Sequence, residues 1–182
     1  MSKLAAEAKE HFGGLSGQQL NWNPVENSWS VGQCFDHLIT THSLYFPLFQ
    51  QLEKGNIRPS FWKRHSPLSG FFGRILIRSL RPENEKKMKT TAKAQPSGSE
   101  IDGRIVEHFC KHQAQLIDHL RKIPADIDAA KTVIASPLLR LVTYSLNDCF
   151  TILIVHGQRH FGQARRVMET EGFPEPQTGG RL

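Results

Sequence analysis

Apolar and polar residues recur with a helical period over residues 147–168. Six positions follow one another at steps of four, three, four, four and three residues: Cys149, Leu153, His156, His160, Ala164 and Val167. These steps place all six side chains on one face of a helix. Ser145 with Asp148 is a helix-start signal, and Gly172 and Pro174 mark the end. We therefore predict a long helix whose inward face is apolar at both ends and carries two histidines in its middle.

Two helices are predicted in the N-terminal third of the chain, over residues 4–12 and 31–55. The first is short, begins close to the N-terminus and stops at the two glycines that follow it. Ser30 followed by Gln33 matches a capping box and starts the second helix. Pro47 should kink or break that helix, because proline has no backbone N–H to donate.

A further helix is predicted from a cap at Ser99 and Asp102 to about Ile123. The sequence shows no convincing strand and no internal repeat. The predicted fold class is therefore all-α: an antiparallel four-helix bundle with a long connection between helices 2 and 3. We expect residues 1–182 to form a single domain.

The long connection, residues 56–98, is basic and contains one amphipathic helical piece at 68–80. Its apolar side holds Phe71, Phe72, Ile75, Leu76 and Leu80, and the arginines Arg74, Arg78 and Arg81 lie elsewhere. We expect this face to cover the bundle or a second subunit. Binding to a membrane surface is the alternative.

The loop between the first two helices contains Trp22 and Trp29 beside Pro24. Tryptophans in such a loop usually plug the end of a bundle, which is what we expect of these two.

The composition is that of an ordinary globular protein, with 38% hydrophobic and 22% charged residues in 182. No run is long enough to span a membrane, and we expect no signal peptide at the N-terminus. Three well-separated cysteines argue against a disulfide framework and for a reducing compartment, so the predicted location is cytoplasmic. The net charge of +6 suits anionic ligands but is not accompanied by the basic, aromatic-rich patch of a nucleic-acid binder, so no nucleic-acid partner is expected.

Three histidines combine an inward direction with helices that can face each other. His156 and His160 are four residues apart, so their rings lie one turn apart and can converge on one ion. His37 lies on the same side of its helix as Leu44 and Leu48. Because imidazole binds zinc, copper, iron and nickel, these residues predict a metal site. Buried histidines satisfied by backbone or water are the alternative.

The remaining histidines are expected outside this site. His108, His112 and His119 lie on one flank of the third helix, away from its apolar seam, and should face solvent. Three others stand alone and should be structural or exposed: His11, His42 and His65.

Three neutral histidines leave open positions on a divalent ion, which is the arrangement of catalytic metals; zinc or nickel is the expected ion. Cys34 precedes His37 by three residues and could supply a fourth, soft ligand, although a buried cysteine more often packs as a small hydrophobe. Asp36 points elsewhere and should be a supporting or surface carboxylate.

With these residues in place, the sequence resembles the DinB-like, or YfiT-like, superfamily of metalloenzymes. The resemblance lies in QLNWNP, WSVGQCFDHL, SPLLRLVTYSLNDCFTILIVHGQRHFGQARRV and the tail GFP, in that order. It implies an up-down-down-up four-helix bundle and a divalent metal held by His37, His156 and His160. Some members are thiol-dependent transferases or isomerases that use bacillithiol or mycothiol. The short first helix and the excursion at 56–98 depart from the family pattern.

The leading functional hypothesis is a metal-dependent enzyme that acts on a small molecule, as a thiol-dependent transferase or a hydrolase. Gln163 and Tyr45 could orient a ligand or water, and no residue stands out as a general base, so the catalytic residues are unknown. The alternative is a non-catalytic, metal-stabilised bundle that binds a small molecule or a protein. An enzyme should have a pocket that reaches the histidines, whereas a binding module should have a sealed cluster.

A homodimer is predicted from an imbalance of apolar surface. The first helix is short, so part of the longer helices stays uncovered by it. Pairing of two copies about a twofold axis would bury that surface, and the family resemblance points the same way.

Overall fold

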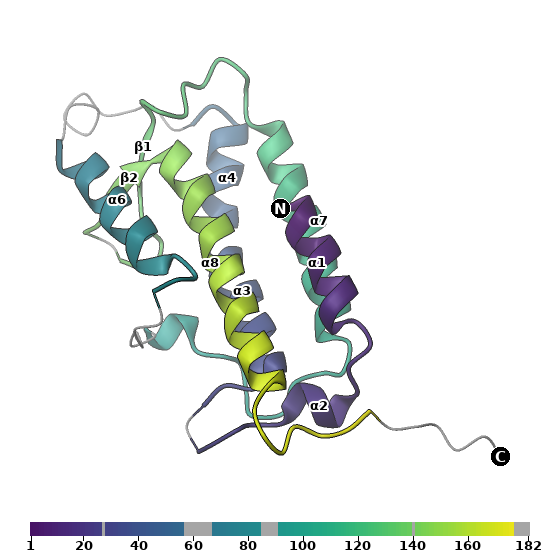
Figure 1. Ribbon diagram of the computed structural model, residues 1–182. Coiled ribbons are helices and arrows are strands. Elements are labelled where there is room, and N and C mark those ends of the chain that lie inside the picture. The colour runs from purple at the N-terminus through teal and green to yellow at the C-terminus, as the bar shows by residue number, and fades with distance from the viewer. Residues whose placement is uncertain (27, 57–66, 85–90, 140, 177–182) are drawn as a thin grey trace.

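The computed structural model describes residues 1–26, 28–56, 67–84, 91–139 and 141–176, and this part of the chain is mostly helical (Figure 1). The helices are α1 (Ser2–Phe12), α2 (Gly17–Asn21), α3 (Val31–Ser43), α4 (Phe46–Glu53), α6 (Pro67–Leu80), the 3-10 turn η1 (Ala92–Ala94), α7 (Ile105–Lys122) and α8 (Leu146–Met168). Two short strands complete the fold, β1 (Val133–Ala135) and β2 (Thr143–Ser145).

The N-terminal caps predicted for α3 and α8 are confirmed. The Ser30 hydroxyl accepts the N–H of Gln33 at 3.1 Å, and the Gln33 side chain accepts the N–H of Ser30 at 3.0 Å. At α8, the Ser145 hydroxyl accepts the N–H of Asp148 at 3.0 Å. Each contact satisfies a backbone donor that has no partner within its own helix.

The break at Pro47 and the start of the third helix can also be compared with the structure. The break expected near Pro47 is present, since α3 ends at Ser43 and a separate helix, α4, begins at Phe46. The start predicted for the third helix at Ser99 and Asp102 is wrong. The Asp102 carboxylate instead accepts the N–H of Arg104 in a short turn at 2.8 Å, and α7 begins after it.

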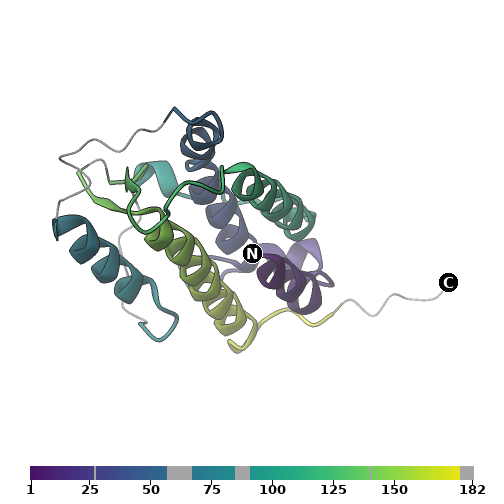
Figure 2. The same cartoon turned by 90° about the horizontal axis from the view of Figure 1, so that it is seen from above.

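Four helices, α1, α3, α7 and α8, pack around a shared apolar core (Figure 2). Each contributes one phenylalanine to its centre, and neighbouring ring centroids lie 5.1 to 5.7 Å apart. The four rings are Phe12, Phe35, Phe109 and Phe161. This interlocked cluster fixes α3 beside α8, the pair of helices that carries the candidate site.

The strands were not anticipated from the sequence. They form an antiparallel pair in which Ile134 lies opposite Tyr144, and both residues are buried. Three residues per strand are too few for a recognisable alternation of apolar and polar positions. The pairing therefore depends on the core that covers it.

The amphipathic piece of the long connection forms α6, which lies against α8 and β2 (Figure 1). Leu76, Ile77 and Leu80 pack on the core, whereas Phe71 and Ile75 are 50% and 49% exposed. The predicted packing face is thus only partly right. The helix is rotated so that Leu76, Ile77 and Leu80 face inward, Phe72 is half-buried, and Phe71 and Ile75 lie at the surface.

Within the described residues, every helix is too short or too polar to cross a membrane.

Candidate metal centre

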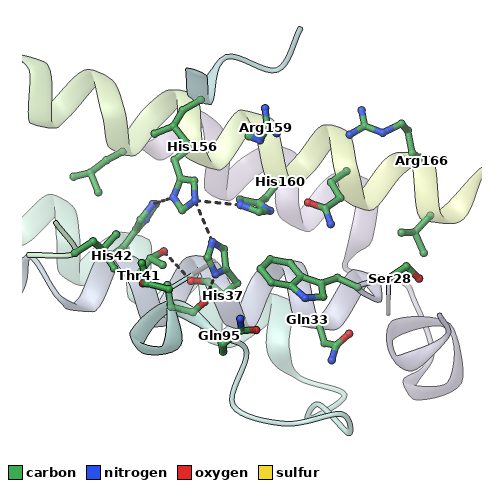
Figure 3. A pocket seen from close by; sticks show the side chains of 18 of the residues that line it. Ser28, Gln33, His37, Thr41, His42, Gln95, His156, Arg159, His160 and Arg166 are labelled. Atoms are coloured by element: carbon green, nitrogen blue, oxygen red, sulfur yellow. Dashed lines mark hydrogen bonds between the residues drawn. The ribbon is translucent and has the colours of Figure 1, made fainter. Parts of the chain in front are cut away.

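The three predicted histidines come together between α3 and α8. The Nε2 atom of His156 lies 3.1 Å from that of His37 and 3.1 Å from that of His160 (Figure 3). One nitrogen from each ring lies within 4.8 Å of the other two. The step of four residues along α8 places two of the rings side by side, and the α3–α8 contact supplies the third.

This donor set fits a divalent cation. At about 2.0–2.1 Å from tetrahedral zinc, two ligand nitrogens would lie about 3.3 Å apart, close to the spacing of these rings. The ring of His37 is already oriented for such a role, because its Nδ1 donates to the carbonyl of Ala94 in η1 at 2.5 Å. A neutral imidazole with its proton on Nδ1 presents a lone pair at Nε2, toward the other two rings.

Burial keeps the three histidines neutral. Desolvation lowers the pKa of His156 to about 3, with a further contribution from His37. It also lowers the pKa of His37, and it lowers that of His160 well below the ordinary value, where His156 adds to the effect. Neutral imidazole is the form that binds a metal, so the site needs little deprotonation near neutral pH.

A second polar layer lies behind the cluster. The Nε2 atom of His42 lies 3.3 Å from Nδ1 of His156, on the side of the ring away from the triad (Figure 3). His42 is fully buried, which agrees with a structural histidine, but its contact with His156 was not expected. The sequence gives little sign of this contact, since His42 is five residues after His37 and meets its partner from another helix.

Trp29 forms one wall of the site. Its ring centroid is 4.7 Å from that of His37 and 5.7 Å from that of His160, with the indole stacked on the latter. Both loop tryptophans pack against the apolar core, and Trp29 also faces the histidine cluster, which the prediction did not include. The indole of Trp22 packs against Phe173, with 5.6 Å between the ring centroids. The position of Trp29 directly before the Ser30 cap was the available signal, because it fixes the ring near the first turns of α3.

A cavity of about 1260 Å³ reaches the three histidines. Gln163 and the basic residues Arg159 and Arg166 line it along α8, while Leu76 and Leu80 of α6 line another part. Glu26 is the acidic residue among the described lining. The cavity can therefore hold a small molecule next to the histidines, in surroundings where basic side chains outnumber acidic ones.

Other proposed participants lie outside the cluster. Cys34 packs in the apolar core, and burial raises the pKa of its thiol to about 12, so it behaves as a small hydrophobe. The carboxylate of Asp36 accepts the N–H of Ser97 at 2.6 Å. Tyr45 borders the cavity, but its hydroxyl is hydrogen-bonded to that of Tyr144, with 2.7 Å between the oxygens.

The remaining histidines differ from the prediction in which of them are buried and which are exposed. His11 is exposed and His108 is partly exposed, whereas His112 is buried, with its Nε2 atom 3.0 Å from the Ser43 hydroxyl. The expected solvent-facing position of His112 is wrong because α7 packs against both α1 and α3, which buries a wider arc than its apolar seam. His119 is partly buried and contacts Glu53 at 2.5 Å, and His65 lies outside the described residues.

The model of one protein family, described as the DinB superfamily, matches residues 2–164. The chain belongs to the DinB superfamily. The DinB match spans α1 to most of α8 and includes His37, His156 and His160, so the histidine cluster lies within the family region. No match was found among the curated proteins or among the solved structures. The family resemblance read from the sequence motifs is confirmed.

Proposed function

We propose that this protein is a divalent-metal-dependent enzyme that acts on a small molecule, as a thiol-dependent transferase or a hydrolase. The observation that carries the proposal is the cavity that reaches three converging histidine nitrogens. A non-catalytic, metal-stabilised bundle would be expected to seal its histidines inside the core. Here the same cluster lines a space large enough for a small molecule.

His37, His156 and His160 would hold the ion, with zinc or nickel as the expected metal. A divalent ion in such a site supplies a Lewis acid that lowers the pKa of a bound thiol or water at neutral pH. An ion held by the three side chains would be accessible from the cavity, because His37, His156 and His160 all line it. The Ala94 carbonyl holds His37 in the tautomer that this role requires.

Other residues of the cavity would bind and orient the substrate. The Trp29 indole excludes water from one side of the histidines and offers a flat apolar face. Gln163, one turn beyond His160, can hydrogen-bond a substrate or water. Arg159 and Arg166 give α8 a positive wall, which suits a substrate with an acidic group, such as a low-molecular-weight thiol that carries a carboxylate.

The proposal also includes the order of the helices, the number of domains and the oligomeric state. We infer that the four packed helices follow the antiparallel, up-down-down-up order of a four-helix bundle and that the chain forms one domain. We also infer that it assembles as a homodimer. The family match and the shared phenylalanine core support the bundle, and the exposed Phe71 and Ile75 on α6 offer apolar surface for pairing.

The decisive experiment combines elemental analysis with a reaction screen. The purified protein should contain about one divalent ion per chain, and the double variant His156→Ala/His160→Ala should lose it while circular dichroism stays helical. The matched control is His11→Ala/His108→Ala, which removes two histidines outside the site and should keep the ion. Metal retained in the first double variant would overturn the proposed site.

The second step separates an enzyme from a binding module. Thiol transfer to an electrophile and ester hydrolysis are assayed with native, metal-stripped and reconstituted protein. Activity that disappears with the metal and returns on reconstitution supports the proposal. Stoichiometric metal with no metal-dependent turnover on either substrate class would favour the non-catalytic bundle.

A further inference from the structure

His42 makes a contact that packing alone does not explain. It lies on α3, is fully buried, and brings its Nε2 atom to 3.3 Å from Nδ1 of His156 (Figure 3). The Nε2 atom of the same His156 ring faces His37 and His160 at 3.1 Å each. Both nitrogens of His156 are thus engaged, one toward the triad and one toward His42.

We propose that His42 is a positioning residue of the metal site, which accepts the Nδ1–H of His156 and thereby holds that ring in its ligand tautomer and orientation. The inference rests on the proposed function, because it assigns His42 a role only if the three histidines bind a metal. It assigns His42 no contact with the metal or with the substrate.

The proton arrangement supports this role. A histidine that binds through Nε2 carries its single proton on Nδ1 when neutral, and a buried N–H needs an acceptor. For His37 the acceptor is the carbonyl of Ala94. For His156 the acceptor is Nε2 of His42, so two of the three rings are held by partners at the nitrogen that faces away from the cluster.

The tautomer of His42 follows from the position of the proton on His156. If its Nε2 accepts a proton from His156, its own proton lies on Nδ1. That atom is buried and has no hydrogen-bond partner among the described residues. An unpaired buried donor costs stability, so the sequence carries a histidine here at a cost that an apolar side chain would avoid. The reverse tautomer would place the proton of His156 at Nε2, where it would block metal binding.

The rings around His42 are consistent with a residue that supports the three candidate ligands and not with a second metal site. Its ring centroid is 5.5 Å from that of His156 and 6.3 Å from that of His112. His112 is hydrogen-bonded to the Ser43 hydroxyl and not to a histidine of the triad. His112 therefore offers a buried histidine near the site that serves as a matched control.

The test measures zinc affinity by competition with a chromogenic chelator, using zinc as the probe. His42→Phe keeps a planar ring but removes the acceptor, and it should weaken zinc binding about 10- to 100-fold while one ion per chain still binds. His42→Gln retains an acceptor oxygen at a similar reach and should recover most of the affinity. The control His112→Phe should bind zinc as the wild type does.

A second readout needs no variant. In zinc-loaded, ¹⁵N-labelled wild-type protein, the imidazole ¹⁵N shifts of His156 should show a protonated Nδ1. An unprotonated Nδ1, or wild-type affinity in a folded His42→Phe variant, would overturn the role of His42 and leave the metal site standing. A wild-type chain that binds no zinc would overturn the proposed site, and this inference with it.

Discussion

The indole ring of Trp29 lies against the imidazole of His37, with 4.7 Å between the ring centroids. The same indole stacks on His160 at 5.7 Å and an interplanar angle of 23°. A residue from the loop before α3 therefore lies against two of the candidate ligands. This contact makes Trp29 a natural reporter of what happens at the cluster.

Nickel binding should quench Trp29 fluorescence, because a paramagnetic ion held by His37 and His160 would lie close to the indole. A nickel titration of the wild type should show a saturable loss of emission. The loss should disappear in Trp29→Phe and persist in Trp22→Phe, whose indole packs against Phe173 away from the site. Equal quenching in the two variants would contradict the proposed position of the ion.

The packing of α6 on α8 depends on the absence of a side chain at Gly73. A Cβ atom there would clash with Oδ2 of Asp148 and would lie 2.9 Å from its Cγ and 3.2 Å from its Cβ. Gly73→Ala should therefore lower the free energy of unfolding by about 1–3 kcal/mol or displace α6. Amide hydrogen exchange over residues 72–80 should rise accordingly.

The matched control for that change is Gly70→Ala on the same helix. Among the described residues, a Cβ atom at Gly70 meets only the end of the Arg74 side chain, at 3.5 Å. Because alanine is a better helix former, this variant should be neutral or gain up to ~1 kcal/mol. If both substitutions had the same effect on exchange in α6, the close contact with Asp148 would not be what sets its position.

The stability of the metal-free protein should fall as the pH falls below about 6.5. Burial lowers the pKa of His112 from 6.5 to about 4, so between these values the unfolded chain binds a proton at this residue that the folded chain does not. Stability therefore rises with pH in this window and is lost on acidification. One such group contributes a slope of about 1.4 kcal/mol per pH unit.

The measurement is urea unfolding in the presence of a chelator, from pH 7.5 to pH 4.5. His112→Gln should make the dependence on pH shallower, whatever it does to stability at pH 7.5. His11→Gln, at an exposed histidine, should leave the slope as it is in the wild type. Parallel curves for wild type and His112→Gln would show that His112 does not keep a lowered pKa in the folded protein.

The homodimer stays a prediction, and the structure indicates where to test it. Phe71 and Ile75 of α6 are about half exposed, whereas Leu76 packs inside its own chain. If α6 forms the interface, Phe71→Ser/Ile75→Ser should halve the mass measured by light scattering while helicity is retained. The control Val25→Ser/Leu141→Ser changes two other exposed apolar residues and should keep the dimer mass.

A wild-type mass that stays monomeric as the concentration rises would rule the dimer out. A dimer that survives substitution of both α6 residues would place its interface on another surface.

Local rules were enough to predict much of the fold and the three candidate ligands. The Ser30 and Ser145 caps, the break at Pro47 and the helical spacing of His156 and His160 depend on neighbours within a few residues, and the structure reproduces each of them. The convergence of His37 on that pair was also expected. Its inward direction follows from the apolar face of its own helix, and the family resemblance indicated its partner helix.

Contacts between distant segments were decided only by the tertiary structure. Trp29 covers the cluster because the loop before α3 folds back over its first turns, and His42 reaches His156 because two helices pack at one particular rotation. The burial of His112 has the same origin, since α7 is covered from two sides. A periodic pattern shows which side of a helix is apolar, but the rotation and depth of packing are set by side chains that lie far apart in the sequence.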